Sequence, residues 1–361
     1  MKISGYAAKS GTTPLGPWEF ERREPGAKDV RIQIEFCGIC HSDIHTVRDE
    51  VDLEERGTPE ILATHPTKTV YPVVPGHEII GRVLEVGSGV AKYKTGDRVG
   101  VGVICDSCRT CDSCKEGLEN YCEPGSRFTY GSFEEDGVTP TYGGYSTHIV
   151  TDEHFVLKIP ENLDPAAAAP LLCAGITVYS PLRHIGLSEG QKLAVMGLGG
   201  LGHVAVKIGA SLGAEVTVFS HSPSKEADAE RLGAKDFVLT TKKNSLAPLS
   251  NRFDVILDTL SAEHDVLGPL DCIKRDGTMI MVGASPELLK FDTLPLMFGR
   301  RSIMGSLIGG MAETQEMLDH CGKNDIVSDI ELIDPPQINE AYERIMKGDV
   351  KYRFVIDCSK F

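Results

Sequence analysis

Four cysteines in the segment DSCRTCDSCKEGLENYC have the spacing of a metal site: Cys108, Cys111, Cys114 and Cys122. Thiolates bind zinc and similar metals tetrahedrally, and a short turn with two cysteines three residues apart directs both sulfurs toward one point. Four sulfurs leave no position for a substrate, so this set predicts a structural metal site. Cys105 offers a second register, but three equal steps would crowd four sulfurs onto a very short loop. A disulfide pair and chance spacing are the remaining interpretations.

A second pattern is typical of a dinucleotide site. The hexapeptide at 197–202 directly follows the apolar run KLAVM (192–196) and opens a helical stretch. Glycines at such a turn allow a tight bend, close approach of the backbone to a pyrophosphate and close helix–strand contact, and the helix N-terminus supplies free N–H groups. A glycine-rich turn without a ligand is the alternative. The predicted binding residues are Gly197, Leu198, Gly199, Gly200, Leu201 and Gly202.

The end of the next apolar run indicates which dinucleotide is bound. A carboxylate about 20 residues beyond the glycines would bind the ribose hydroxyls of NAD. Ser220 stands there instead, followed by His221, Ser222 and Lys225. Hydroxyls and an ammonium group can bind a 2′-phosphate, which a carboxylate would repel, so this segment favours NADP(H). The alternative for Lys225 is a solvated residue at a helix start.

Further cysteine, histidine and acidic residues occur in CGICHSDIH (37–45), PGHEIIG (75–81) and LLCAGITVYS (171–180). With these segments the chain resembles the zinc-dependent medium-chain alcohol dehydrogenases, and within them the NADP-linked cinnamyl-alcohol-dehydrogenase type. The resemblance extends over nearly the whole length, because several separate motifs occur in the same order. The other shared segments are the four-cysteine loop, GGYSTHIV, GLGGLGHVAVK, GSLIGG and RFVID.

The resemblance implies a catalytic zinc held by Cys40, His77 and Cys173, a ligand set known from alcohol dehydrogenases that leaves one position open. Glu78 and Asp43 would orient these ligands and temper the charge of the metal, and Glu78 would also contact the zinc while substrate exchanges.

The resemblance also implies a proton relay, in which Ser42 contacts the substrate oxygen and His45 exchanges the proton with solvent. An imidazole suits that exit because its pKa is ordinarily near neutrality. Further cofactor contacts are implied at His41, Thr177, Thr259, Gly283, Ser306, Leu307, Ile308 and Arg353. Among these, His41 and Arg353 would lie near phosphates and Thr177 near the nicotinamide.

Two different patterns of expected secondary structure divide the chain into domains. Short β runs broken by Gly and Pro fill the first part, whereas strands and helices alternate from about residue 158, which predicts a parallel sheet covered on both faces. With the resemblance, we expect an α/β protein with a GroES-like, partly open β-barrel catalytic domain at 1–157 and 304–361, including the metal loop 105–122. A Rossmann domain with a doubly wound parallel sheet would occupy 158–303. The resemblance further implies an active site in the cleft and a homodimer joined near 301–306.

Composition limits the partners. The chain has 361 residues, 41% apolar and 25% charged, with a net charge of −15, which argues against nucleic-acid or anionic-membrane binding. No apolar stretch approaches the roughly 20 residues of a membrane span. The N-terminus lacks the apolar core of a signal peptide, and the 11 cysteines fall at metal spacings, so reduced thiols and a cytoplasmic location are expected.

The expected function is zinc-dependent interconversion of aldehydes and primary alcohols with NADP(H), chiefly aldehyde reduction over a broad aromatic and aliphatic range. One alternative is an NAD-linked polyol or amino-alcohol dehydrogenase, and another is a non-catalytic zinc-binding module. An insert at 50–69 lengthens the stretch between His45 and His77. It could cover the substrate entrance or form a surface excursion, and long loops tolerate the latter at small entropic cost.

Overall fold

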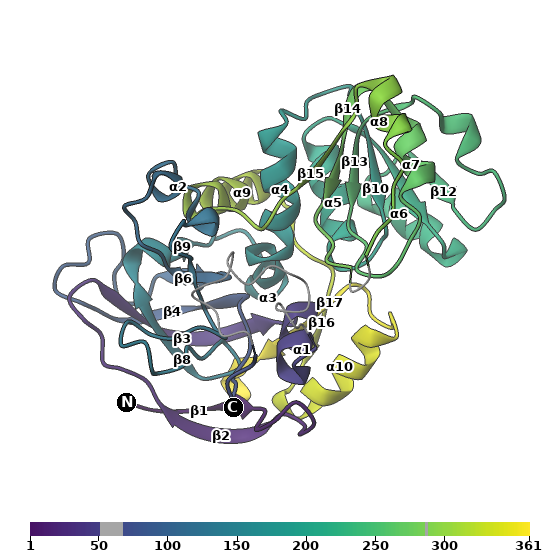
Figure 1. Ribbon diagram of the computed structural model, residues 1–361. Coiled ribbons are helices and arrows are strands. Elements are labelled where there is room, and N and C mark those ends of the chain that lie inside the picture. Colours follow the sequence, from purple (N-terminus) through teal and green to yellow (C-terminus); the bar gives the residue numbers. More distant parts are fainter. Residues whose placement is uncertain (51–67, 286–287) are drawn as a thin grey trace. The chain divides into compact units, whose positions relative to one another are not determined.

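The computed structural model describes residues 1–50, 68–285 and 288–361, which form two compact units (Figure 1). One unit consists of Met1–Cys173 with Gly309–Phe361, and the other of Ala174–Ile308. The domain boundaries predicted at 157/158 and 303/304 stay a prediction. Positions 51–67 of the predicted insert lie outside the described residues, so the role of the insert stays open.

The first unit is built around a mostly antiparallel sheet in which β3 is central. Strand order is β16-β17-β3-β4-β5-β9, with β8 also paired to β3, and β1–β2 and β6–β7 form two further ribbons. Its strands are β1 (Lys2–Ala7), β2 (Gly16–Glu21), β3 (Asp29–Gly38), β4 (Ile79–Val86), β5 (Arg98–Val101), β6 (Ile104–Asp106), β7 (Arg127–Phe128), β8 (His148–Asp152), β9 (Leu157–Lys158), β16 (Ile330–Ile333) and β17 (Arg353–Asp357).

The core of the first unit forms because β-branched residues alternate along these strands. Ile32 and Ile34 of β3, Val83 of β4 and Val99 of β5 are buried in one cluster with Phe354 of β17. The antiparallel pairing of β17 with β3 joins the last strand of the chain to an early one. The helices of this unit are α1 (His41–Arg48), α2 (Asp112–Lys115), α3 (Pro165–Ala168), α9 (Met311–Lys323) and α10 (Ile338–Met346).

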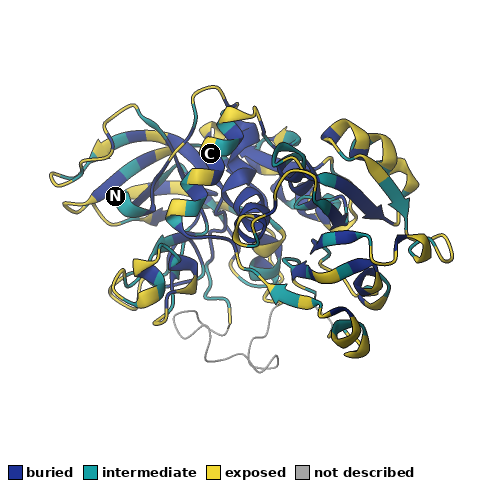
Figure 2. Cartoon of the chain, turned by 90° about the horizontal axis from the view of Figure 1, so that it is seen from above, coloured by how far each residue is buried: buried dark blue, intermediate teal, exposed yellow. Residues whose placement is uncertain are grey.

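The second unit is a parallel six-stranded sheet in the order β12-β11-β10-β13-β14-β15. The strands Lys192–Met196 and Phe253–Asp258 are largely apolar and buried, as expected for strands covered on both faces, and Figure 2 draws buried residues in dark blue. The sheet consists of β10 (Lys192–Met196), β11 (Glu215–Ser220), β12 (Asp236–Leu239), β13 (Phe253–Asp258), β14 (Ile273–Met281) and β15 (Ser302–Gly305). The helices are α4 (Ala174–His184), α5 (Gly202–Ser211), α6 (Glu226–Leu232), α7 (Leu267–Cys272) and α8 (Leu294–Gly299).

The order of this sheet reverses between β10 and β13. From β10 the chain builds outward to β11 and β12, and it then returns to place β13 on the other side of β10. At such a switch point the connections after the two neighbouring strands run to opposite sides of the sheet and leave a crevice. Ligands of open α/β sheets bind in this crevice, at the carboxyl ends of the strands. The second unit is therefore a doubly wound, Rossmann-type sheet.

In the described part of the chain, no single helix is long and apolar enough to cross a membrane, although one bent pair, Pro165–Leu172 with Ala174–His184, meets the criteria of length and composition. All the cysteines of the chain are free thiols.

Candidate metal and dinucleotide sites

The first candidate site begins where β3 ends. Cys40 caps the N-terminus of α1 with extended backbone angles, and the Asp43 carboxylate accepts a hydrogen bond of 2.8 Å from the Cys40 backbone N–H. This reciprocal cap determines how the thiol projects at the start of the helix. Asp43 is fully buried and also accepts from the Gly76 N–H at 3.0 Å and from the Tyr145 hydroxyl at 3.2 Å. Asp43 is thus a fixed group behind the thiol.

His77 lies next to Asp43 and belongs to the same cluster as Cys40. Its Nδ1 lies 3.7 Å from Asp43 Oδ1, and its ring stacks on Tyr130 with centroids 5.5 Å apart. Its Nε2 is buried and has no hydrogen-bond partner among the described residues. The pKa of His77 is raised to about 9, because the charges of Asp43 and Cys40 outweigh the burial that lowers it. With the Asp43 carboxylate near Nδ1 and no hydrogen-bond partner at Nε2 in the described chain, the imidazole can offer Nε2 to a metal.

Glu78 and Arg353 form a buried pair next to these residues. The Arg353 guanidinium donates to Glu78 Oε1 and, at 2.8 Å, to the Ile39 carbonyl. Glu78 Oε2 is buried without a hydrogen-bond partner in the described chain, and a Cβ atom at Gly38 would lie 1.9 Å from it. Burial raises the pKa of Glu78 to about 7. Arg353 was predicted to contact a cofactor phosphate; its contacts here lie beside the metal-site candidates, and the phosphate contact stays a prediction.

Cys173 completes the set from the end of the segment after α3. Its Sγ lies 3.9 Å from Cys40 Sγ, and one ligand atom from each of Cys40, His77, Glu78 and Cys173 falls within 4.8 Å of the others. The contact between the two sulfurs lowers the pKa of Cys40 and raises that of Cys173. Two thiols, an unpartnered imidazole nitrogen and an unpartnered carboxylate oxygen, all converging, are donors that suit zinc. These residues therefore fit the predicted metal.

The relay candidates lie on α1 beyond Cys40. Ser42 Oγ is 3.7 Å from Cys40 Sγ and is exposed, while Asp43 points inward. His41 is the first residue of α1, and its ring centroid lies 6.3 Å from that of His45. His45 Nδ1 lies 2.8 Å from a carboxylate oxygen of Glu50. Sequence reasoning missed Glu50, and the only local indication was an acidic residue soon after the histidine.

The four-cysteine loop forms a second cluster. The sulfurs of Cys108, Cys111, Cys114 and Cys122 lie within 4.8 Å of one another. Backbone N–H groups of Thr110 and Cys111 donate to Cys108 Sγ and lower the pKa of that thiol to about 6. Cys105 is not in this cluster, since its thiol donates to backbone carbonyls of β7. The geometry therefore favours the register that ends at Cys122.

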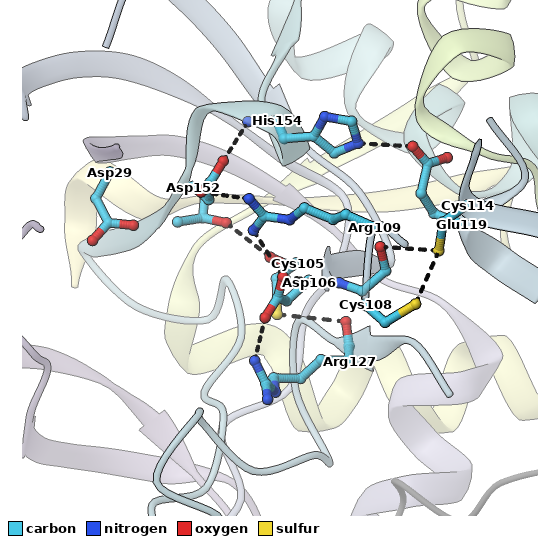
Figure 3. A network of polar contacts seen from close by, with 12 residues as sticks. Asp29, Cys105, Asp106, Cys108, Arg109, Cys114, Glu119, Arg127, Asp152 and His154 are labelled. Carbon is cyan, nitrogen blue, oxygen red and sulfur yellow. Dashed lines mark hydrogen bonds and ion pairs between the residues drawn. The ribbon is translucent and has the colours of Figure 1, made fainter. Parts of the chain in front are cut away.

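Charged side chains attach this loop to the rest of its unit (Figure 3). Arg109 donates at 2.8 Å both to Asp106 and to Asp152 of β8. Glu119 accepts from His154 Nε2 at 2.7 Å and from the Met311 N–H, at the start of α9, at 2.9 Å. Segments far apart in the sequence are thereby held around the sulfur cluster.

The glycine turn lies in the second unit, between β10 and α5. Gly197 has a φ of 89°, which favours glycine, and a Cβ at Gly202 would lie 2.0 Å from the Gly197 carbonyl oxygen. A Cβ at Gly199 would meet nothing within 4 Å. The first and last glycines are thus required by packing, whereas the middle one borders open space. That space is where a pyrophosphate could approach the backbone at the start of α5.

The residues predicted to select NADP(H) follow β11. Ser220 is buried and its hydroxyl accepts from the Ser222 N–H at 3.2 Å. The Lys225 ammonium donates at 2.7 Å to the carbonyl of Leu198 in the glycine turn, and His221 is exposed. No carboxylate occupies the end of β11. The structure therefore places the Lys225 ammonium at the glycine turn, and its contact with a 2′-phosphate stays a prediction.

The other predicted cofactor residues are distributed over the second unit. Thr177 lies buried on α4, and the Thr259 hydroxyl donates to the Met196 carbonyl at 2.7 Å. A Cβ at Gly283 would lie 2.1 Å from the Leu260 carbonyl oxygen. The segment after β15 holds Ser306, whose N–H donates to Met281, followed by Leu307 and by Ile308 at a φ of 39°. Thr259 and Gly283 thus lie near the glycine turn.

Comparison with known proteins agrees with this geometry. Residues 26–161 match the family model of the alcohol dehydrogenase GroES-like domain, and residues 200–323 match that of the zinc-binding dehydrogenases. The NADP-dependent alcohol dehydrogenase C 1 of Mycolicibacterium smegmatis is 52% identical over 98% of this chain and 97% of its own. The solved structure of a cinnamyl alcohol dehydrogenase (CAD) from Sorghum bicolor is similar with a TM-score of 0.91 and 41% identity, over 99% of this chain and 98% of that one. The structure of CAD from Helicobacter pylori complexed with NADP(H) has a TM-score of 0.89 and 38% identity, over 100% and 99%.

The chain therefore belongs to the zinc-dependent alcohol dehydrogenase family, and it is an oxidoreductase. Its first unit has the GroES-like fold of that family and its second unit the Rossmann-type fold. The expected fold class is confirmed, and the non-catalytic zinc module considered from the sequence is not favoured.

Proposed function

We propose that this protein reduces aldehydes to primary alcohols with NADPH, and oxidises such alcohols in the reverse direction. The observation that carries the proposal is the convergence of Cys40, His77 and Cys173 on one point, with His77 Nε2 buried and unpartnered in the described chain. A donor set of this composition can hold zinc and still leave a position for substrate oxygen. The relatives named for alcohol dehydrogenase and cinnamyl alcohol dehydrogenase activity support the same reaction class.

We propose two zinc ions per chain with different tasks. Cys40, His77 and Cys173 would hold the catalytic ion, with Glu78 close enough to exchange with substrate, and the four-cysteine cluster would hold the structural ion. When bound, the catalytic zinc supplies a Lewis acid that polarises a carbonyl oxygen, and the nicotinamide supplies a hydride. The buried Asp43 would fix the tautomer of His77 so that Nε2 remains the ligand atom.

Proton transfer would use α1. Ser42 is exposed beside Cys40, where a hydroxyl can contact the reacting oxygen, and His45 stands one turn further along the helix. The Glu50 carboxylate accepts from His45 Nδ1, which leaves Nε2 to take and release protons. Ser42 would pass the proton toward His45 by way of the cofactor ribose, as the family resemblance implies.

NADP(H) is proposed as the cofactor because Ser220 replaces the carboxylate that would bind an NAD ribose. Lys225 lies at the glycine turn, and we infer that its ammonium group would also donate to a 2′-phosphate. The relatives include an NADP-dependent alcohol dehydrogenase and a structure complexed with NADP(H). The free thiols are consistent with the predicted cytoplasmic location.

A homodimer is proposed at the edge of the second unit. β15 pairs only with β14 among the described strands, so its outer edge can accept another strand. Nearby, Met297 and Phe298 of α8 are 72% and 87% exposed, which is unusual for large apolar side chains. A second copy related by a two-fold axis would cover both features with one self-complementary interface.

The function is tested by the initial rate of NADPH consumption, and separately of NADH, with aromatic and aliphatic aldehydes. Zinc content is measured on the same preparations. Cys173→Ala should lower kcat/KM roughly a thousandfold, because the loss of a metal-based stabilisation of several kcal/mol corresponds to about that factor. Cys272→Ala, which removes a buried thiol of the second unit that belongs to neither cluster, is the matched control.

Two zinc ions in wild type and fewer in Cys173→Ala, with activity in wild type and in the control variant, would support the assignment. Turnover with NADH alone would refute the cofactor proposal. Turnover of polyols in place of aldehydes would refute the substrate class.

A further inference from the structure

The carboxyl ends of β10 and β13 lie side by side at the switch point of the second unit. The two strands are parallel neighbours with Met196 opposite Asp258. The glycine turn leaves β10, and the segment Asp258–Leu260 leaves β13 in the same direction. Because dinucleotides bind outside this edge of the sheet, the loop after β13 faces the same region as the glycine turn.

The Leu260 side chain of this loop packs on the first glycine of the turn, and its backbone packs on Gly283. A Cβ at Gly197 would lie 2.6 Å from Leu260 Cδ2, and a Cβ at Gly283 would lie 2.1 Å from the Leu260 carbonyl oxygen. Thr259 donates to the Met196 carbonyl, the last of β10. The position of Thr259 and Leu260 therefore sets the shape of the space beside the turn.

A buried hydrogen-bonded pair, Asp258 and His264, anchors the loop at its far end. Asp258 Oδ1 accepts from the Leu260 N–H at 3.0 Å, and Asp258 Oδ2 lies 2.6 Å from His264 Nε2. His264 Nδ1 lies 2.6 Å from the Ala262 carbonyl oxygen. The side chains of Asp258 and His264 are 1% and 11% exposed, although the residues between Leu260 and His264 are exposed. An otherwise exposed loop is thus held by one inward-pointing imidazole.

The hydrogen-bond pattern makes this anchor complete. A carbonyl oxygen only accepts, so His264 Nδ1 carries a proton, and Nε2 shares a second proton with Asp258. Both nitrogens and both carboxylate oxygens therefore have partners, and the loss of either side chain would leave a buried polar group unpaired.

We propose that Asp258 and His264 are positioning residues for the dinucleotide: their pair holds Thr259 and Leu260 against the glycine turn and so preforms the cofactor site. This inference rests on the proposed use of NADP(H). Neither side chain need contact the reacting atoms, so the pair should affect cofactor affinity more than chemistry. Preorganisation of a binding loop acts in this way, because the loop is ordered before the ligand arrives.

The test is the dissociation constant of NADPH, measured by fluorescence titration of wild type and His264→Ala. We expect the variant to bind NADPH about tenfold more weakly, the factor that corresponds to one lost hydrogen bond to a charged group. The KM for aldehyde and kcat at saturating NADPH should stay within about twofold, since the zinc ligands lie in the other unit. Glu263→Ala, an exposed neighbour on the same loop, is the matched control and should bind as wild type does.

Three further variants separate positioning from folding. Asp258→Asn can still accept from Leu260 and can donate to a neutral His264, so its NADPH affinity should stay close to wild type, whereas Asp258→Ala should lose it. His264→Ala could melt at a lower temperature because it leaves the buried Asp258 carboxylate unpaired. The double variant Asp258→Asn/His264→Ala removes that charge but still leaves the loop unanchored. Its binding of NADPH should therefore stay weak. Wild-type affinity in His264→Ala or in this double variant would overturn the inference.

The same titrations distinguish failure of the NADP(H) proposal from failure of the positioning inference. If wild type binds NADH instead, the same variants are compared with NADH, and only the cofactor choice is refuted. If wild type binds neither dinucleotide, both proposals fall.

Discussion

The proposed relay residue His45 contacts Glu50 through Nδ1 and is not one of the proposed zinc ligands, so its side chain can be removed without changing the proposed metal site. His45→Ala should lower kcat by about a hundredfold, the usual contribution of a positioned acid–base group. Glu50→Gln should cause a smaller loss, because an amide can still accept from His45 Nδ1 but no longer balances its charge. Steady-state rates with NADPH and a fixed aldehyde measure both effects.

The control for this prediction is His184→Ala, an exposed histidine at the end of α4. It should leave kcat unchanged, and zinc content should be equal in all three variants. A kcat of His45→Ala equal to that of wild type would mean that protons leave the site by another route.

At the scale of elements, the four-cysteine loop depends on one carboxylate for its connection to α9. Glu119 is buried and accepts from both His154 and the Met311 N–H. Glu119→Ala should lower the free energy of unfolding by about 2 kcal/mol, because two hydrogen bonds to a buried carboxylate are lost. Thermal or urea unfolding monitored by circular dichroism measures this, with the exposed Glu116→Ala as the control from the same loop.

The same carboxylate should make this stability depend on pH. Burial raises the pKa of Glu119, but the hydrogen bonds from His154 and Met311 outweigh it and the net pKa lies below the ordinary 4.5. A lowered carboxyl pKa stabilises the fold above the unfolded-state value, and this contribution disappears as pH falls through the folded-state value. The difference in unfolding free energy between wild type and Glu119→Ala should therefore shrink as pH falls below about 4.5. A difference that grows in acid would contradict this account.

At the scale of the whole molecule, the exposed apolar residues of α8 and the open edge of β15 predict self-association. Phe298→Asp should convert a dimer to a monomer, because a carboxylate at the centre of an apolar interface is left without compensation. Sedimentation velocity at micromolar concentration gives the mass directly. Lys290→Asp, also a charge change in the segment before α8, should leave the mass unchanged. A monomeric wild type would refute the dimer.

The sequence was sufficient to predict elements and motifs whose pattern lies within a short stretch of chain. The apolar run at 192–196 forms a strand with the same bounds in the structure, because an unbroken apolar run needs no distant partner to be recognised. The spacing of the four cysteines and of the glycine turn is local too. By contrast, the bounds of the short β runs in the first part depend on pairing with neighbouring strands, which no local pattern shows.

What the sequence by itself determined is the identity and the order of the reactive residues and the strongly periodic elements around them. Only the tertiary structure decided which of these residues meet. Cys173 lies 3.9 Å from Cys40 across a long stretch of chain, Arg353 pairs with Glu78, and His264 anchors its loop on Asp258. Such contacts arise from the packing of strands that are distant in sequence, and a buried polar atom can be recognised as unpartnered only when every neighbour has been placed.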